Sequence, residues 1–108
     1  MKNLTRKEEL ILLSILNLDK EAYLIAITDY LTKITGKKVS LTSVHLPLSR
    51  LEKCGLIEGK YGEATAVRGG RKKKIYTITP LGQEILEEHK RITDALWSEY
   101  IKFSTPDD

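Results

Sequence analysis

The sequence has a single cysteine and no long apolar run, and each shortage excludes a class of protein. Cys54 is the only cysteine among 108 residues, so neither a disulfide framework nor a thiolate cluster can form. Apolar runs such as that from Leu10 to Leu13 are far shorter than the roughly 20 residues that span a bilayer. The first ten residues, MKNLTRKEEL, carry charges where a secretory signal has its apolar stretch. We therefore expect a cytoplasmic protein with no membrane partner.

Catalytic and metal-binding motifs are also missing. The two histidines, His45 and His89, are far apart in the chain, and Cys54 has no evident base. No HExxH, GxSxG, phosphate-binding loop or paired CxxC spacing occurs. We therefore expect neither an enzyme nor a bound metal or cofactor, although a site dispersed along the chain would leave no such motif.

Charge is abundant but unevenly distributed. The formal net charge is +3, from 18 Lys and Arg against 15 Asp and Glu. Residues 1–78 hold 15 basic and 8 acidic side chains, whereas residues 79–108 hold 3 basic and 7 acidic. A basic part followed by an acidic part predicts a polyanion as the partner.

Two helices are predicted in the first third of the chain. Thr5 and Glu8 form a capping-box pattern before the stretch LILLSILNL. This stretch is apolar on nearly all sides, so we expect it to be buried, in part by a second subunit that Leu12 contacts. Asp19 predicts the N-cap of a second helix that runs to about residue 35, where Gly36 can adopt a left-handed C-cap.

A third helix is predicted over about residues 41–54. Val44, Leu48 and Leu51 recur at helical spacing and form its core face. The other side carries side chains that can form hydrogen bonds with a partner, namely Thr42, His45, Ser49 and Glu52. Pro47 lies within this pattern, where it can bend the helix or delay its start.

The last 50 residues predict a hairpin followed by a long helix. Two short strand-forming runs within about residues 56–78 enclose a segment rich in Gly, Lys and Arg. Thr79 and Pro80 then supply an N-cap and a first helical residue. The helix can run to residue 103 with one apolar stripe, and its length exceeds what a domain of this size covers alone. We expect a disordered tail at residues 104–108, and we expect a second subunit to contact Ile92, Leu96, Trp97 and Tyr100.

This order predicts a mainly α fold with a small antiparallel β-hairpin, a winged helix-turn-helix over residues 1–79 with a C-terminal dimerisation helix over residues 80–103. In such a domain the third helix enters the DNA major groove and the hairpin, or wing, reaches the backbone or minor groove. Between Lys60 and Lys74 the chain has six basic residues and one acidic. Phosphate contacts are therefore predicted for Arg68, Arg71, Lys72, Lys73 and Lys74.

Four stretches together resemble the PadR-like transcriptional regulators. They are SVHLPLSRLEKCGLI at 43–57, RGGRKKKIYTIT at 68–79, the Thr79, Gly82 and Leu86 pattern, and Ala22 with Tyr23. The resemblance implies a dimeric repressor whose Tyr23 touches the DNA backbone and whose Ser43 begins the reading face. It also implies that the C-terminal helix forms the dimer. That family usually has Tyr where this chain has His45, with Pro directly after it.

Other interpretations remain for several residues. His45 is either a DNA contact or an exposed polar residue, and Arg50 is expected to pair with Glu52 or a helix end rather than with DNA. Cys54 is expected in the core. Trp97 packs across the dimer or forms the wall of a pocket for a small aromatic effector. The alternative functions are a winged-helix module for protein interactions and a non-specific nucleic-acid binder.

Overall fold

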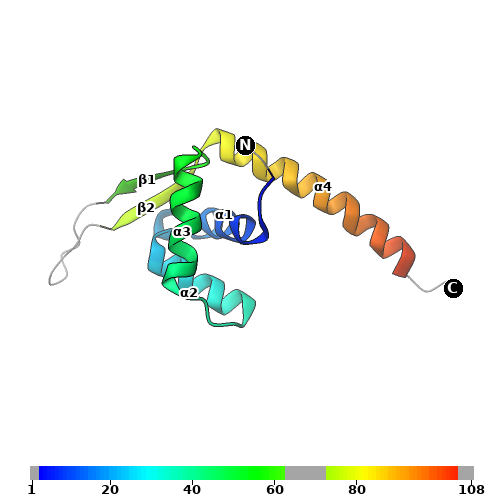
Figure 1. Ribbon diagram of the computed structural model, residues 1–108, viewed down its shortest axis with the longest axis horizontal. Helices are drawn as coiled ribbons and strands as arrows, with labels where there is room; N and C mark the ends of the chain where they lie inside the picture. The colour runs from blue at the N-terminus through cyan, green and yellow to red at the C-terminus, as the bar shows by residue number, and fades with distance from the viewer. Residues whose placement is uncertain (1–2, 63–72, 105–108) are drawn as a thin grey trace.

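The computed structural model describes residues 3–62 and 73–104, with side chains as far as Tyr100. Three helices form a compact body from which a two-stranded hairpin and a long C-terminal helix project on different sides (Figure 1). The predicted fold class, mainly helical with one antiparallel hairpin, is confirmed. The predicted disordered tail, residues 104–108, begins one residue too early, because Ser104 is still part of the C-terminal helix. Residues 105–108 lie outside the described residues.

Helix α1 spans Arg6–Leu18 and begins with the predicted capping box. The Thr5 hydroxyl accepts from the Glu8 amide at 3.1 Å, and a Glu8 carboxylate oxygen accepts from the Thr5 amide at 2.9 Å. The two bonds satisfy donors that a helix start leaves unpaired. They also hold the Glu8 carboxylate in a fixed position at the protein interior, where it is buried.

The second helix begins later than predicted, because Asp19 is not its N-cap. Asp19 terminates α1 with a positive φ of 53°, and a short 3-10 turn, Asp19–Glu21, follows. Helix α2 spans Leu24–Thr35 and ends at Gly36, which adopts the predicted left-handed conformation at φ 74°. The reason for the late start is a tertiary contact. The Ala22 carbonyl accepts from the Tyr76 amide of the hairpin at 2.8 Å, and Ala22 is fully buried.

Helix α3 spans Leu41–Lys53 without a break and contains Pro47. Ser40 caps it by accepting from the Ser43 amide at 3.2 Å. The hairpin follows directly: β1, Ile57–Tyr61, pairs antiparallel with β2, Lys74–Ile78, so that Ile57 faces Ile78 and Tyr61 faces Lys74. Figure 1 shows the hairpin beside α3 and extending beyond it.

The core lies where α1, α2, α3 and the base of the hairpin meet. Helix α1 supplies its centre, since its inner side chains contact all the other elements of the body. The fully buried large side chains come from each of these elements: Ile11, Leu12, Ile27, Val44, Leu48, Leu51, Leu56 and Ile57. Leu13 and Leu16, on the other side of α1, are exposed, so the prediction that this helix is buried all round holds for one side only.

Cys54 is exposed, so its predicted place in the core is wrong. It is the C-cap residue of α3, and Gly55 turns the chain away with a φ of 80°. The helix therefore ends at Lys53, and Leu51 is its last inward-facing residue.

Helix α4, Pro80–Ser104, starts from a tightly packed junction. The Thr79 hydroxyl accepts from the Gly82 amide at 3.1 Å and donates to the Gly55 carbonyl at 2.6 Å, which confirms the predicted N-cap. The Thr79 amide donates to the Leu56 carbonyl at 3.0 Å. A Cβ atom on Gly82 would overlap that carbonyl, so only glycine allows the helix to lie this close to the exit of α3.

Replacing Gly82 with Ala should destabilise the fold. The added methyl group must push the start of α4 away from Leu56, and overpacking of this kind costs about 1–3 kcal/mol. Urea denaturation followed by circular dichroism, at one fixed protein concentration, measures the change. Gln83→Ala, at an exposed neighbour on α4, is the control and should change stability by less than about 0.5 kcal/mol. Equal stability of the two variants would contradict the tight junction.

Candidate nucleic-acid interface

One face of α3 packs on the core and the opposite face points to solvent. Val44, Pro47, Leu48 and Leu51 form the buried face. Pro47 cannot donate to the Ser43 carbonyl one turn earlier, and burial of its ring on this apolar side offsets part of that cost. The predicted core face of the helix is therefore confirmed.

A stripe of four residues runs along the outward face of α3, and we call it the α3 stripe. Thr42, Leu46, Ser49 and Lys53 recur at i, i+4, i+7 and i+11, the spacing that keeps side chains on one side of a helix. Thr42, Leu46 and Lys53 are exposed, and Ser49 is half-buried. Leu46 and Lys53 were not among the residues singled out from the sequence. Both could have been found from the sequence, because helical spacing places them directly opposite Val44, Leu48 and Leu51.

His45 and Ser43 lie on the flanks of α3 rather than in the α3 stripe. His45 is exposed. Ser43 is half-buried, and its hydroxyl donates to the Ser40 carbonyl at 2.8 Å. Because that donor is already used at the helix cap, Ser43 is left with acceptor capacity only.

Tyr23 and Lys73, which the sequence placed far apart, lie together. The Lys73 ammonium stands 4.2 Å from the centre of the Tyr23 ring, within the range of a cation–π contact. The hydrogen bond from the Tyr76 amide to the Ala22 carbonyl holds β2 beside the start of α2 and so brings the two residues together. The other predicted wing contacts, Arg68, Arg71 and Lys72, lie outside the described residues.

Lys74 points towards α3 and is partly exposed. Its ammonium donates to a carboxylate oxygen of Glu52 at 3.0 Å. This hydrogen bond is the main reason that the pKa of Lys74 is raised above its ordinary value. Lys74 therefore stays protonated throughout the neutral range, with its charge partly compensated by Glu52.

Arg50 has a structural partner, but not the expected one. Its guanidinium lies 3.2 Å from the second carboxylate oxygen of Glu8, on α1. The pair joins the capped start of α1 to the middle of α3. Glu52, which with a helix end was one of the two partners predicted for Arg50, is bound to Lys74 instead.

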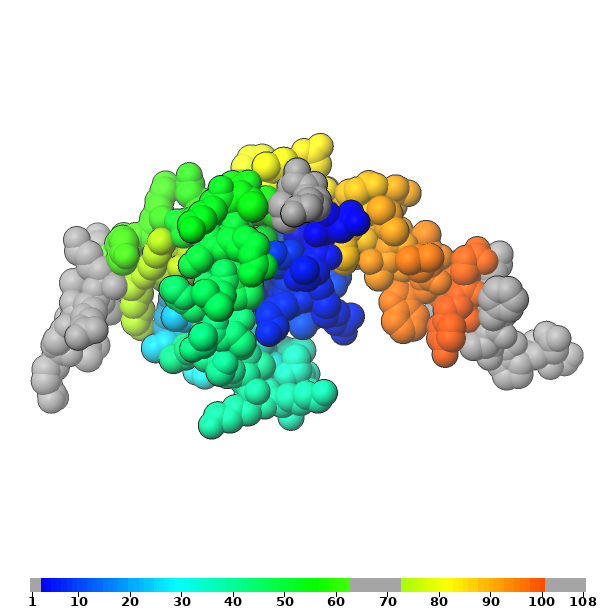
Figure 2. All heavy atoms as spheres, in the orientation of Figure 1, coloured from blue at the N-terminus to red at the C-terminus, as the bar shows by residue number. Residues whose placement is uncertain are grey.

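The apolar residues of α4 are uncovered in the single chain. Ile92, Leu96, Trp97 and Tyr100 are between 46% and 66% exposed. Figure 2 shows that the C-terminal half of α4 stands clear of the helical body. Leu12 differs from these residues, because it is fully buried in the monomer core. It is therefore removed from the expected set of dimer contacts.

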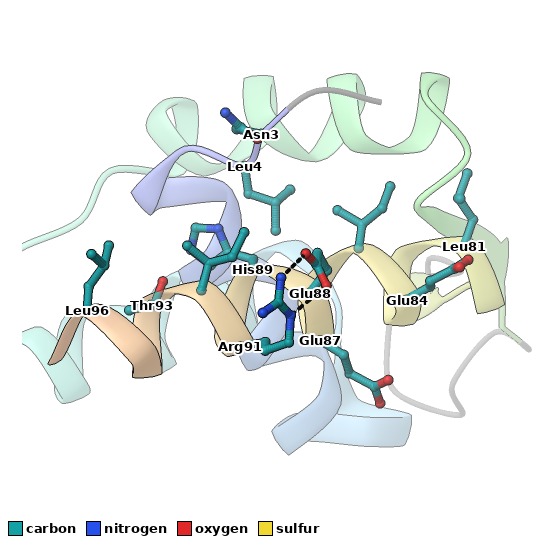
Figure 3. Close-up of a pocket in the computed structure, with 12 residues that line it drawn as sticks. Asn3, Leu4, Leu81, Glu84, Glu87, Glu88, His89, Arg91, Thr93 and Leu96 are labelled. Atoms are coloured by element: carbon teal, nitrogen blue, oxygen red, sulfur yellow. Dashed lines mark hydrogen bonds and ion pairs between the residues drawn. The ribbon is translucent and has the colours of Figure 1, made fainter. Parts of the chain in front are cut away.

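A hollow of about 970 Å³ runs along α4 beside the start of α1. Its apolar walls include Leu4 and Leu96, which Figure 3 labels, and also Ile85 and Ile92. His89 lies on this side of α4, with its imidazole 3.5 Å from the Glu9 carboxylate of α1. The hollow is thus continuous with the apolar stripe of α4.

Two kinds of site were not found in the described residues. Across residues 3–62 and 73–104, no group of three or more His, Cys, Asp or Glu side chains could hold a metal ion. Nor does any helix in the same ranges have the length and apolar character needed to cross a membrane.

Comparisons with known proteins place the chain in a family. The family model described as the transcriptional regulator PadR-like family matches residues 12–88. The fold is similar to that of a PadR-like transcriptional regulator from Bacillus cereus, with 28% identity, a TM-score of 0.73 and coverage of 94% of this chain and 96% of that one. It is also similar to a PadR-like transcription factor from Bacteroides fragilis, with 26% identity, a TM-score of 0.70 and coverage of 92% and 93%.

The comparison with curated protein sequences gave no match. The family match begins at Leu12, within α1, and continues through α2, α3 and the hairpin to the start of α4, so it includes all four stretches on which the sequence resemblance rested. The chain therefore belongs to the PadR-like family of transcriptional regulators, which bind DNA.

Proposed function

We propose that the protein is a repressor that binds a two-fold symmetric operator as a homodimer. The observation that carries this proposal is the pairing of two surfaces: an outward α3 stripe on a rigid core, and a basic hairpin fastened to the same helix. A helix held in this way can enter a major groove while the wing meets the adjacent backbone. The core face of α3 leaves only the α3 stripe and its flanks available to the bases.

Phosphate contacts are proposed for the wing and for the start of α2. Lys73 is exposed and lies over Tyr23, so a backbone phosphate near this pair can accept from both the ammonium and the phenol hydroxyl. Arg68, Arg71 and Lys72 belong to the same basic segment of the sequence. Contacts of this kind fix the register on the duplex and make affinity depend on salt.

The triple variant Arg71→Ala, Lys72→Ala and Lys73→Ala should bind every duplex more weakly and show a flatter salt dependence. Each lost phosphate contact reduces the slope of log K against log salt by about 0.9. Fluorescence anisotropy of a labelled duplex between 50 and 300 mM salt measures both quantities. Lys90→Ala, on exposed α4, is the control with one charge removed. An unchanged slope in the triple variant would refute the wing contacts.

Base contacts are proposed for the α3 stripe and the adjacent His45. Thr42, Ser49 and His45 can exchange hydrogen bonds with base edges. Leu46 cannot, yet it is 59% exposed at the centre of the stripe. In the major groove an apolar side chain is complementary to the methyl group of thymine. Leu46 is therefore proposed to select a thymine in each half-site.

Replacing one thymine of the selected half-site with uracil should weaken binding by about fourfold, because burial of one methyl group is worth about 0.8 kcal/mol. Leu46→Ala should bind more weakly and lose this sensitivity. The duplex is first selected from a random pool, and uracil is then introduced at each thymine in turn. Leu41→Ala, an exposed leucine off the stripe, should keep the sensitivity. If Leu46→Ala still distinguishes thymine from uracil at that position, Leu46 does not read it.

Dimerisation is proposed through α4. The apolar stripe of Ile92, Leu96, Trp97 and Tyr100 and the hollow beside the start of α1 together form one uncovered surface. A second copy of α4 would cover it and complete the small core. Two copies related by a two-fold axis present two α3 helices, and the angle between the α4 helices sets the distance between them.

The double variant Leu96→Glu and Tyr100→Glu should be monomeric, since two carboxylates would have to be buried in an apolar interface. Light scattering gives the mass, which should fall from twice that of the chain to that of one chain. Affinity for a duplex with two half-sites should fall much more than affinity for a single half-site. Ser98→Glu, on the opposite side of α4, is the control and should remain dimeric. A monomeric wild-type protein would refute the proposal directly.

A small aromatic effector is the proposed signal. Trp97 and Tyr100 form an edge-to-face pair with ring centres 5.6 Å apart, and with Thr93 and Leu96 they line a shallow apolar hollow. A planar compound that bound there would change how two α4 helices pack. The spacing of the two α3 helices would change with it, and binding to the operator would be weakened.

A further inference from the structure

Lys74 is held on the face of the hairpin that contacts α3. In the β1–β2 register Tyr61 pairs with Lys74 and Gly59 pairs with Tyr76. These two pairs are two residues apart along each strand, so all four residues lie on one face of the hairpin. Glu52, in the last turns of α3, meets the same face through its 3.0 Å bond with Lys74.

The groups around the Lys74 ammonium restrict its position. The centres of the Tyr76 and Tyr61 rings lie 5.6 and 5.9 Å from the ammonium nitrogen, at cation–π distance. The lysine stem passes over Gly59. A Cβ atom at that position would overlap the stem and lie 3.2 Å from the Glu52 carboxylate. Because Gly59 has no side chain, the Lys74 stem has room to cross β1 and reach α3.

Lys73 and Lys74 are adjacent lysines with different environments. Both side chains of the Lys74–Glu52 pair are only 32% exposed, whereas Lys73 is exposed above Tyr23. Because Glu52 compensates the charge of Lys74, a phosphate that approached Lys74 would have to compete with a carboxylate already in place. Lys73 is thus suited to contact a phosphate, and Lys74 is suited to bind Glu52.

We propose that Lys74 and Glu52 form a latch that sets the position of the wing relative to α3, and that Lys74 is a positioning residue rather than a phosphate contact. The inference rests on the proposed DNA-binding function. With the latch closed, the hairpin and α3 meet the duplex as one rigid unit. With the latch broken, the wing must be ordered on binding, and affinity falls at every salt concentration.

Matched substitutions separate the two roles. Lys73→Met and Lys74→Met each remove one charge and keep most of the apolar stem. Lys73→Met should lower the salt slope by about 0.9. Lys74→Met should lower affinity by about threefold to fivefold with the slope unchanged, since a pair of this exposure is worth up to about 1 kcal/mol. A slope that falls equally in both variants would overturn the latch.

Substitution of Glu52 separates the two possible roles of Lys74, because they predict opposite changes in DNA affinity. If Lys74 binds phosphate, Glu52→Gln frees it and strengthens binding. If the latch holds, Glu52→Gln weakens binding relative to Glu58→Gln, which removes an equal charge from an exposed residue of β1. The reversed pair Glu52→Lys with Lys74→Glu should restore affinity to within about threefold of wild type, whereas each single reversal should not. Failure of the double variant to recover would also overturn the latch.

Hydrogen exchange of the β1 and β2 amides in the free protein makes the test independent of DNA. Exchange should be faster in Lys74→Met and Glu52→Gln than in Lys73→Met, and the reversed pair should slow it again. If the wild-type protein binds no duplex from the random pool, the proposed function fails, and exchange still reports whether the pair holds the hairpin. Equal exchange rates in Lys73→Met and Lys74→Met would refute the latch even where DNA binding is intact.

Discussion

The contact between the start of α4 and the exit of α3 is the constraint on which the arrangement of the molecule depends. Gly82 lies against the Leu56 carbonyl with no room for a side chain, and Thr79 bonds to Gly55 and Leu56. These bonds fix the direction in which α4 leaves the body. Since α3 ends at the same place, the angle between α3 and α4 is set within a few residues. In the proposed dimer, a change in how two α4 helices pack would therefore change the position of α3.

The hairpin is attached to the body at two points that have different physical character. A backbone hydrogen bond from Tyr76 to Ala22 ties β2 to the start of α2, and the ion pair of Lys74 with Glu52 ties it to α3. The first bond is buried and does not depend on side-chain identity. The second is accessible to water and salt, so it is the weaker of the two. The orientation of the wing is therefore the property most easily altered by substitution.

Most of the fold could be predicted from the sequence because its signals are local. The Thr5 and Glu8 capping box, the left-handed Gly36, and the Thr79 and Pro80 helix start each depend on residues within one turn. The errors have non-local causes. Asp19 could not cap α2, because Ala22 is needed by Tyr76 more than 50 residues later in the chain.

The candidate site was predicted in outline but not in its pairings. Arg50 was expected to pair with Glu52 or a helix end, and the structure gives Arg50 and Glu52 separate partners on other elements, Glu8 and Lys74. No sequence pattern specifies which of two adjacent charges faces which neighbour. Leu46 and Lys53 illustrate a different limit. Helical spacing already placed both residues opposite the core face. They were missed because short side chains that form hydrogen bonds were expected to contact the partner.

These pairings change how the charge of the wing should be counted. Between Lys60 and Lys74 the sequence holds six basic side chains, but Lys74 is compensated by Glu52 and Lys60 lies 4.0 Å from Glu58. Of the three wing lysines that the structure describes, Lys73 is the one whose charge neither Glu52 nor Glu58 compensates. A sequence count overestimates electrostatic affinity wherever a helix supplies carboxylates to an adjacent hairpin. In this protein Glu52 compensates Lys74 and also holds the hairpin against α3. The electrostatic contribution to affinity is therefore smaller, but the position of the hairpin is better defined.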